Sequence, residues 1–157
     1  MRSADIKRIL KDHKFQPAGV ISCRIRDNLP VPVFELSEEY RHSALFSSQE
    51  LVYLWVHTVN RQYKNIVYVG QTKKTLSQRC NQHRNGASQA PSGSNRGRAN
   101  AQKIFDLTRG GAIKIYVRSS SKASILGERY ISLCEAEERA LIQKCQRYGA
   151  SLWNGIA

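Results

Sequence analysis

The sequence predicts an α+β fold with a small central antiparallel sheet of about three strands, flanked by helices and preceded by an N-terminal extension. Strand-like runs at residues 51–58 and 65–71 are separated by a polar turn, and a third run follows at 112–117. Two patterns of the capping-box type precede segments of helical periodicity. These observations and the length of 157 residues fit one domain with an additional arm.

Residues 1–48 form the predicted N-terminal extension. A short helix is expected at 3–13, where apolar residues recur at helical spacing. The stretch that follows is mixed, because Pro30 and Pro32 interrupt it, and a short extended piece is expected beside them. The main domain is therefore predicted at 49–157.

Side chains of the first two strand-like runs sort by parity, because successive residues of a strand face opposite sides of a sheet. One face is predicted to be aliphatic, with Val52, Leu54, Val56, Val67 and Val69. The opposite face is predicted to carry Tyr53, Trp55, His57, Ile66, Tyr68 and Gly70. A slip of one residue would separate the aliphatic side chains, so their burial fixes the register and places the two tyrosines on one face.

A helix is predicted from about 76 to 85, because Thr75 and Gln78 form a capping-box pattern. Arg79 and His83 lie four residues apart on this helix and are therefore neighbours on its surface. The pattern brings a guanidinium and an imidazole close to the end of the second strand-like run.

Positive charge dominates the composition, since 25 Lys and Arg against 12 Asp and Glu give a net charge of +13. No acidic residue lies between Glu50 and Asp106. This excess predicts an anionic partner, and the absence of a basic amphipathic helix with exposed apolar residues disfavours a membrane surface. A nucleic-acid backbone is the expected partner, with predicted contacts at Lys73, Lys74, Arg84, Arg96 and Arg98.

Two interpretations stay open for the Gly/Ser-rich basic stretch at 86–98: a flexible linker, or a segment that nucleic acid orders through Arg96 and Arg98. A helix is expected after it at about 99–108. The last helix is expected to begin with the capping-box pattern of Ser132 and Glu135 and to stop at Gly149.

Apolar runs in the chain fall short of the roughly 20 residues that span a bilayer, and the amino terminus lacks the apolar segment of a secretion signal. A cytoplasmic protein without a membrane partner is therefore expected. The four cysteines include no Cys-x-x-Cys pair, which predicts free thiols rather than a zinc ribbon or a disulfide framework.

Three glutamates cluster on the last predicted helix, and one of them is a candidate metal ligand. Glu138 shares the helix's apolar stripe, where a carboxylate is costly to bury unless a cation meets it. Glu135 is the main competitor for this role, although the capping box already uses it. Glu137 lies beside the stripe and is expected to be solvated.

A set of short motifs and single residues follows a fixed order along the chain. It begins with Leu51-Val52-Tyr53 and Tyr68-Val69-Gly70, continues with Arg79 and His83, and ends with Glu138, ahead of a Leu-Ile pair, and Asn154. In spacing and order these residues resemble the GIY-YIG nuclease superfamily. The likeness covers about residues 50–155 and has nothing comparable for the first 48. It departs from the family pattern at Leu51, which replaces a glycine, and in lacking the proline that usually precedes the final asparagine.

The resemblance implies a metal-dependent endonuclease that hydrolyses phosphodiester bonds in DNA, of restriction, phage-associated or mobile-element type. It implies catalytic roles for Tyr53, Tyr68, Arg79 and His83, with Glu138 holding Mg²⁺, for which Mn²⁺ would substitute. Gly70 and Asn154 would support the site. Double-stranded DNA is the implied substrate, a homodimer is possible because a palindromic cutter needs two sites, and residues 1–48 could form a DNA-contact or dimerisation arm.

Two other functions fit the same residues. A non-catalytic nucleic-acid-binding protein could keep the fold and the basic surface without cutting its ligand. A basic partner of an acidic protein is the third alternative, and competition by nucleic acid would separate it from the other two.

Overall fold

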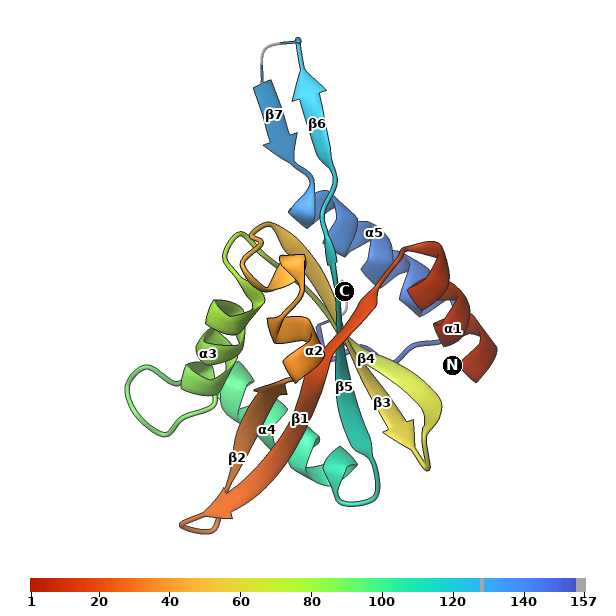
Figure 1. The fold of residues 1–157 in the computed structure, drawn as a ribbon. Helices are drawn as coiled ribbons and strands as arrows, with labels where there is room; N and C mark the ends of the chain where they lie inside the picture. The colour runs from red at the N-terminus through yellow and green to blue at the C-terminus, as the bar shows by residue number, and fades with distance from the viewer. Residues whose placement is uncertain (128, 155–157) are drawn as a thin grey trace.

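Five antiparallel strands form the central sheet of the computed structural model, which describes residues 1–127 and 129–154 (Figure 1). The strands are β1 (Gln16–Arg26), β2 (Leu29–Leu36), β3 (Leu51–Val59), β4 (Gln62–Thr72) and β5 (Ala112–Ser119). They lie in the order β2-β1-β5-β3-β4. The predicted α+β class is confirmed, but the prediction of about three strands is wrong.

The two additional strands come from the amino-terminal segment. β1 pairs with β2 and also with β5, so this segment joins the same sheet as the predicted hairpin. Pro30 and Pro32 obscured β2 in the sequence because proline lacks the N–H that a central strand needs. β2 is an edge strand, and there the missing donors are tolerated.

Helices cover both faces of the sheet (Figure 1). α3 (Leu76–Gly86) and α4 (Asn95–Thr108) pack on one face, while α1 (Ser3–Asp12) and α5 (Cys134–Arg147) pack on the other. The shorter elements are α2 (Glu38–Arg41), a 3₁₀ turn (Ala44–Phe46), and a two-stranded ribbon of β6 (Lys122–Ile125) and β7 (Arg129–Ser132) that projects from the body.

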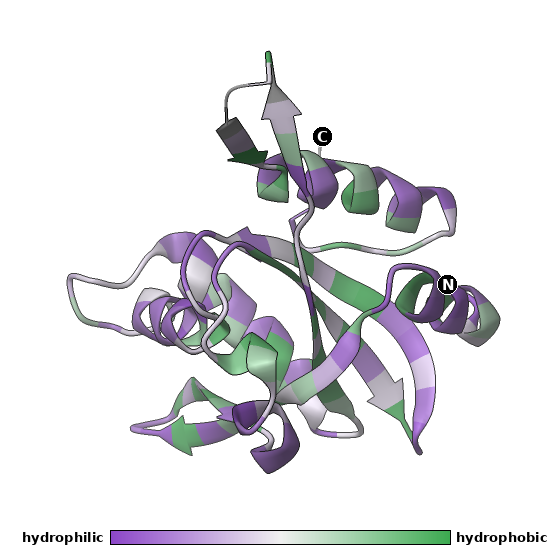
Figure 2. Cartoon of the chain, turned by 45° about the horizontal axis from the view of Figure 1, so that its top comes forward, coloured by the Kyte–Doolittle hydropathy of each residue, from purple (hydrophilic) through white to green (hydrophobic). Residues whose placement is uncertain are grey.

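Each face of the sheet has its own apolar cluster, and Figure 2 shows hydrophobic residues along the central strands between the helices. Val52, Leu54 and Val56 pack beneath α1 and α5, whereas Tyr53 and Trp55 pack beneath α3 and α4. None of the helices in the described part of the chain has the length and apolar character needed to cross a membrane.

A β-bulge changes the predicted faces of two residues in β4. Trp55 pairs with Tyr68, but Val56 pairs with Ile66, so Val67 is an extra residue in the ladder. Ile66 therefore joins the aliphatic cluster, and Val67 lies on the tyrosine face, the reverse of the strict alternation predicted. Tyr53 and Tyr68 still share one face, as predicted.

The start of α3 agrees with the prediction, whereas the starts of α4 and α5 differ from it. The capping box of Thr75 and Gln78 is formed in both directions at the start of α3. α4 begins earlier than predicted, because Ser94 caps it by accepting from the Gly97 N–H. The capping box predicted for α5 is wrong: the N-cap is Leu133, and the Ser132 hydroxyl accepts from the Cys134 N–H.

The C-terminal segment closes the free edge of β4. The Trp153 N–H donates to the Val67 carbonyl over 2.8 Å. The Asn154 side-chain amide donates to the Val69 carbonyl and accepts from the Val69 N–H, the latter over 3.3 Å. These bonds satisfy backbone groups that an edge strand would otherwise leave open.

We expect Asn154→Ala to lower the free energy of unfolding by about 1–3 kcal/mol, because it leaves both polar groups of Val69 without their partner. Urea denaturation monitored by tryptophan fluorescence measures the change. Asn85→Ala, at an exposed position of α3, is the control and should change stability by no more than about 0.5 kcal/mol. Equal effects of the two substitutions would contradict the role of Asn154 as an edge clamp.

Candidate active site

Three aromatic rings of β3 and β4 form a stacked layer on the face covered by α3. The Tyr53 and Tyr68 rings stack with centroids 6.1 Å apart and an interplanar angle of 14°. Trp55 stacks on the other side of Tyr68 at 4.4 Å. The ladder register sets this arrangement, since Tyr53 lies opposite Gly70 and Trp55 opposite Tyr68.

The Tyr53 hydroxyl is held between two side chains of α3. It accepts a hydrogen bond from Arg79 Nε over 3.0 Å and lies 2.7 Å from His83 Nε2. Arg79 and His83 are four residues apart on one helix, so the guanidinium and the imidazole reach the same phenol. Tyr53 is only 1% exposed, so the cluster is rigidly enclosed on the sheet side.

His83 is neutral at ordinary pH. Burial, reinforced by the positive charge of Arg79, lowers its pKa to about 3. A neutral Nε2 that faces a phenol accepts its proton in a hydrogen bond. The Tyr53 hydroxyl thus accepts from Arg79 and donates to His83, which orders the three groups into a directed chain.

Burial also sets the protonation of the tyrosines. It raises the pKa of Tyr53 well above its ordinary value and raises the pKa of Tyr68, with Arg79 opposing the shift in both cases. Arg79 hydrogen-bonds the Tyr53 hydroxyl, interacts favourably with Tyr68 as well, and stays charged. The phenols are therefore protonated at neutral pH, and a phenolate would form only with direct help from a neighbour.

Gly70 leaves the space that the Tyr53 ring occupies. A Cβ atom added at position 70 would overlap the ring and the hydroxyl of Tyr53. Any larger residue would therefore push the phenol away from Arg79 and His83. The structure gives a steric reason for the glycine that follows Tyr68-Val69.

Glu138 is half-buried on α5, close enough to Arg79 and Tyr68 to interact with both electrostatically. Burial raises its pKa, and Arg79 opposes that rise. Its carboxylate forms no hydrogen bond, and no ion pair within 4.0 Å, with any residue that the structure describes. α5 contacts the edge strand β4, which lets Glu138 approach the site although α5 packs on the opposite face.

The other two glutamates of α5 are engaged elsewhere. Glu135 is exposed and lies 3.6 Å from Lys73 Nζ. Glu137 is not solvated as predicted: it accepts from the Ser121 N–H over 3.0 Å and lies 3.5 Å from Arg118. Glu138 is thus the glutamate of this helix that faces Arg79 without a direct partner among the described residues.

The side chains near Arg79 include few potential metal ligands. No group of three or more His, Cys, Asp or Glu side chains gathers within the described ranges 1–127 and 129–154. A single half-buried carboxylate without a direct partner nevertheless suits Mg²⁺, because that ion keeps several of its waters and takes only one or two protein carboxylates. Glu138 is the residue that would hold it.

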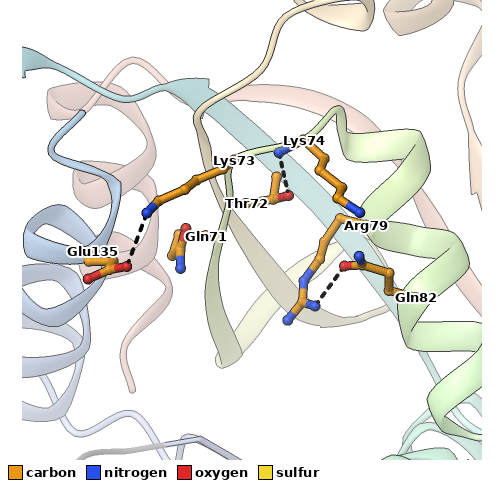
Figure 3. A pocket seen from close by; sticks show the side chains of 7 residues that line it. All are labelled: Gln71, Thr72, Lys73, Lys74, Arg79, Gln82 and Glu135. Atoms are coloured by element: carbon orange, nitrogen blue, oxygen red, sulfur yellow. Dashed lines mark hydrogen bonds and ion pairs between the residues drawn. The ribbon is translucent and has the colours of Figure 1, made fainter. Parts of the chain in front are cut away.

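A hollow of about 310 Å³ opens beside the cluster and is lined by Gln71, Thr72, Lys73, Lys74, Arg79, Gln82 and Glu135. Figure 3 shows Lys73 and Glu135 on one side and Arg79 and Gln82 on the other. Arg79 Nη1 donates to Gln82 Oε1 over 3.0 Å, which orients the guanidinium toward the hollow. Two lysines and one arginine make this hollow suited to a phosphate group.

The three remaining predicted contacts lie apart from this hollow. Arg98 donates to the Ser88 carbonyl and to Asn95 Oδ1, so it holds the 86–94 loop against α4. Arg96 is exposed and near enough to Tyr68 to lower its pKa slightly. Arg84 lies in the last turn of α3, on the side that faces β1 and β2.

No protein-family model and no curated protein matches the sequence. Solved structures do match. A mutant of bacteriophage T4 EndoII aligns with a TM-score of 0.62 and 18% identity, over 96% of this chain and 98% of that one. The restriction endonuclease Hpy188I, solved in complex with product DNA, aligns with a TM-score of 0.52 and 11% identity, over 95% of this chain and 82% of that one. Both are GIY-YIG nucleases.

The chain has the GIY-YIG nuclease fold. The resemblance stated from the sequence is therefore confirmed at the level of the fold. The aligned share of 96% reaches into the amino-terminal segment, for which the sequence offered nothing comparable. That segment belongs to the same sheet, which explains why the alignment extends through it.

Phe34 is a site residue that the sequence did not indicate. It lies on β2, and its ring stacks on His83 with centroids 5.9 Å apart and an interplanar angle of 19°. Trp55 covers another side of the imidazole at 4.8 Å. No spacing pattern marks Phe34, because strand pairing through β1 and β5 brings it to this part of the GIY-YIG fold.

We expect His83 to remain neutral as the pH falls through the ordinary histidine range near 6.5 and to titrate at about 3. Phe34→Ala should raise this pKa toward 6.5, because it admits water to the imidazole. Histidine ring shifts followed by NMR from pH 8 down to about 2 measure both. Phe46→Ala, at a ring that packs edge-on against Tyr40, is the matched control and should leave the titration unchanged.

The same shift predicts a pH dependence of stability. The unfolded chain binds a proton at His83 near pH 6.5, whereas the folded chain binds it only near pH 3, so this residue's contribution is present above 6.5 and is lost as the pH falls toward 3. Thermal unfolding of the native protein and His83→Phe across this range tests the sign. A larger loss in the variant than in the native protein would contradict it.

Proposed function

We propose that this protein is a metal-dependent endonuclease that hydrolyses phosphodiester bonds in DNA, of restriction, phage-associated or mobile-element type. The observation that supports it most directly is the chain of Arg79, Tyr53 and His83 beside the carboxylate of Glu138, which has no direct partner among the residues that the structure describes. Fold likeness to T4 EndoII and to Hpy188I, the latter solved with product DNA, adds support.

Hydrolysis requires a water to attack phosphorus, a group to take its proton, and a donor to balance charge on the phosphoryl oxygens. Arg79 supplies the fixed charge and planar donor fork for the phosphate. The new P–O bond forms from the water, the ester P–O bond breaks, and the leaving oxygen takes up a proton from solvent.

The water's proton passes to Tyr53 while the Tyr53 proton passes to His83, and His83, whose low pKa of about 3 disfavours the charged form, releases that proton to solvent. A free phenolate is disfavoured at a buried site, but this exchange never requires one, because the neutral imidazole already accepts the phenol's proton in a hydrogen bond of 2.7 Å. Tyr68 also interacts with Arg79 and helps to position the guanidinium.

Mg²⁺ held by Glu138 would supply Lewis-acid stabilisation of the leaving oxygen, and Mn²⁺ would substitute for it. Gly70 and Asn154 support this arrangement by seating Tyr53 and by fixing β4 at Val69. Lys73 and Lys74 hold the adjoining phosphates in the hollow beside Arg79.

Double-stranded DNA is the proposed substrate in a cytoplasmic setting. One such site cuts one strand at a time, so a cut through both strands requires a homodimer or two successive nicks. Residues 1–48, proposed as a DNA-contact or dimerisation arm ahead of a nuclease domain at 49–157, also contribute Phe34 to the site.

A non-catalytic nucleic-acid-binding protein of the same fold is the second candidate. The near-complete burial of Tyr53 favours it, because a phenol that is 1% exposed has little room for a water. This candidate predicts binding that weakens steeply with salt and no nicking with any divalent ion.

Supercoiled plasmid incubated with the protein and Mg²⁺ should be nicked, and EDTA should prevent it. Arg79→Ala and Glu138→Gln should each reduce the nicking rate by about 10²–10³ or more, because the first removes a preorganised donor to the phosphate and the second removes the carboxylate that would hold Mg²⁺. Glu39→Gln, at an exposed position of α2 that does not line the hollow beside Arg79, is the control and should retain activity. Full activity in both site variants would rule out this site, and no nicking by the native protein would favour the second candidate.

A further inference from the structure

Two adjoining hollows form a groove on the opposite flank of α3 from Arg79. One hollow of about 380 Å³ is lined by Arg24, Arg26 and Arg84 together with Val31 and Pro32. The neighbouring hollow of about 410 Å³ shares Arg26, Arg84 and both floor residues and continues to Ser88 and Gln89. We call this surface the arginine groove.

We propose that the arginine groove binds the phosphate backbone of the duplex that flanks the cleavage site. This inference rests on the proposed action on DNA, and it assigns to the β1–β2 ribbon a contact surface separate from the catalytic cluster.

The three arginines are exposed. None of them forms an ion pair within 4.0 Å with a carboxylate of the described residues, and Arg84 bonds only the neutral side chain of Asn81. Asp27, in the ribbon's turn, is the single acidic residue on the described lining of the two hollows. A net positive groove of this kind complements a polyanion.

The floor of the groove argues against a protein strand as the occupant. β2 is an edge strand, and a strand from another chain would need its free N–H groups to extend the sheet. Pro30 and Pro32 remove two of these donors. Arginine side chains can still bind phosphate oxygens over such a floor, because their donors project from the rims rather than from the strand.

The arginine groove lies close enough to the catalytic hollow for one duplex to contact both, with its flanking segment in the groove. α3 separates the two surfaces: Arg79 and Gln82 line the catalytic hollow, whereas Arg84 and Asn85 line the groove. A backbone that crosses α3 would contact both. A two-stranded ribbon such as β1–β2 also has the width that the major groove of DNA admits.

The test uses the full chain with Glu138→Gln in EDTA, so that binding is measured without cleavage. Arg24→Gln, Arg26→Gln and Arg84→Gln combined should reduce the slope of log K against log salt for a 30-base-pair duplex by about 2–3, because each lost phosphate contact removes about 0.9. Each single variant should remove about 1, which keeps the test decisive if the triple variant folds poorly.

The matched control removes the same charge from the other face of the molecule. Lys7, Arg8 and Arg147 are exposed on α1 and α5, and their combined substitution by Gln should leave the slope within about 0.5 of the parent. Equal losses in the two triple variants would show a dependence on net charge alone and would overturn the inference.

A second binding measurement, with a poly-glutamate peptide, tests whether the groove binds an acidic protein instead. If the groove variants bind duplex as the parent does but lose binding of a poly-glutamate peptide, the groove serves an acidic protein and the inference is wrong. Failure of the proposed hydrolysis is distinguishable, because a protein that never nicks plasmid can still show the slope change. Conversely, an unchanged slope in a protein that cuts DNA overturns only the groove.

Discussion

The buried hydrogen bonds of the Tyr53 hydroxyl are the constraint on which the rest of the site depends. This hydroxyl accepts a hydrogen bond from the guanidinium of Arg79, so its own proton points to the imidazole of His83. Because the hydroxyl is buried, bulk water does not replace either bond in the resting protein. Three distant features are needed for this geometry: the missing side chain at Gly70, the spacing of α3, and the aromatic wall that Phe34 and Trp55 build around His83. Electrostatics and packing therefore act on the same few atoms.

Both edges of the sheet contribute to that geometry. At one edge the C-terminal segment hydrogen-bonds β4 at Val67 and Val69, next to Tyr68. At the other edge β2 brings Phe34 to the imidazole, and its prolines are tolerated because an edge strand can lack these N–H donors. The amino-terminal segment is thus part of the sheet that supports the cluster, and the site draws on residues from nearly the whole length of the chain.

Local patterns in the sequence predicted what depends on neighbours along the chain. The capping box of Thr75, the shared face of Arg79 and His83, and the common face of the two tyrosines follow from helical and strand periods. Features that depend on distant pairing were missed: the strands β1 and β2, the contact of Phe34 with His83, and the extra residue at Val67. The cap of α5 was mispredicted because Ser132 bonds Cys134 instead, a local competition that the pattern alone does not reveal.

The two register irregularities in the β3–β4 hairpin have a consequence for how this chain tolerates change. Both lie between the turn and the tyrosines, at Trp55/Val56 and His57/Thr58. Each irregularity leaves one β4 residue, Val67 or Lys64, without a partner on β3, so the alternation of faces near the turn is shifted relative to that at the tyrosines. Substitutions in the turn at Asn60 and Arg61 therefore fall outside the stretch of ladder that orients the two phenols.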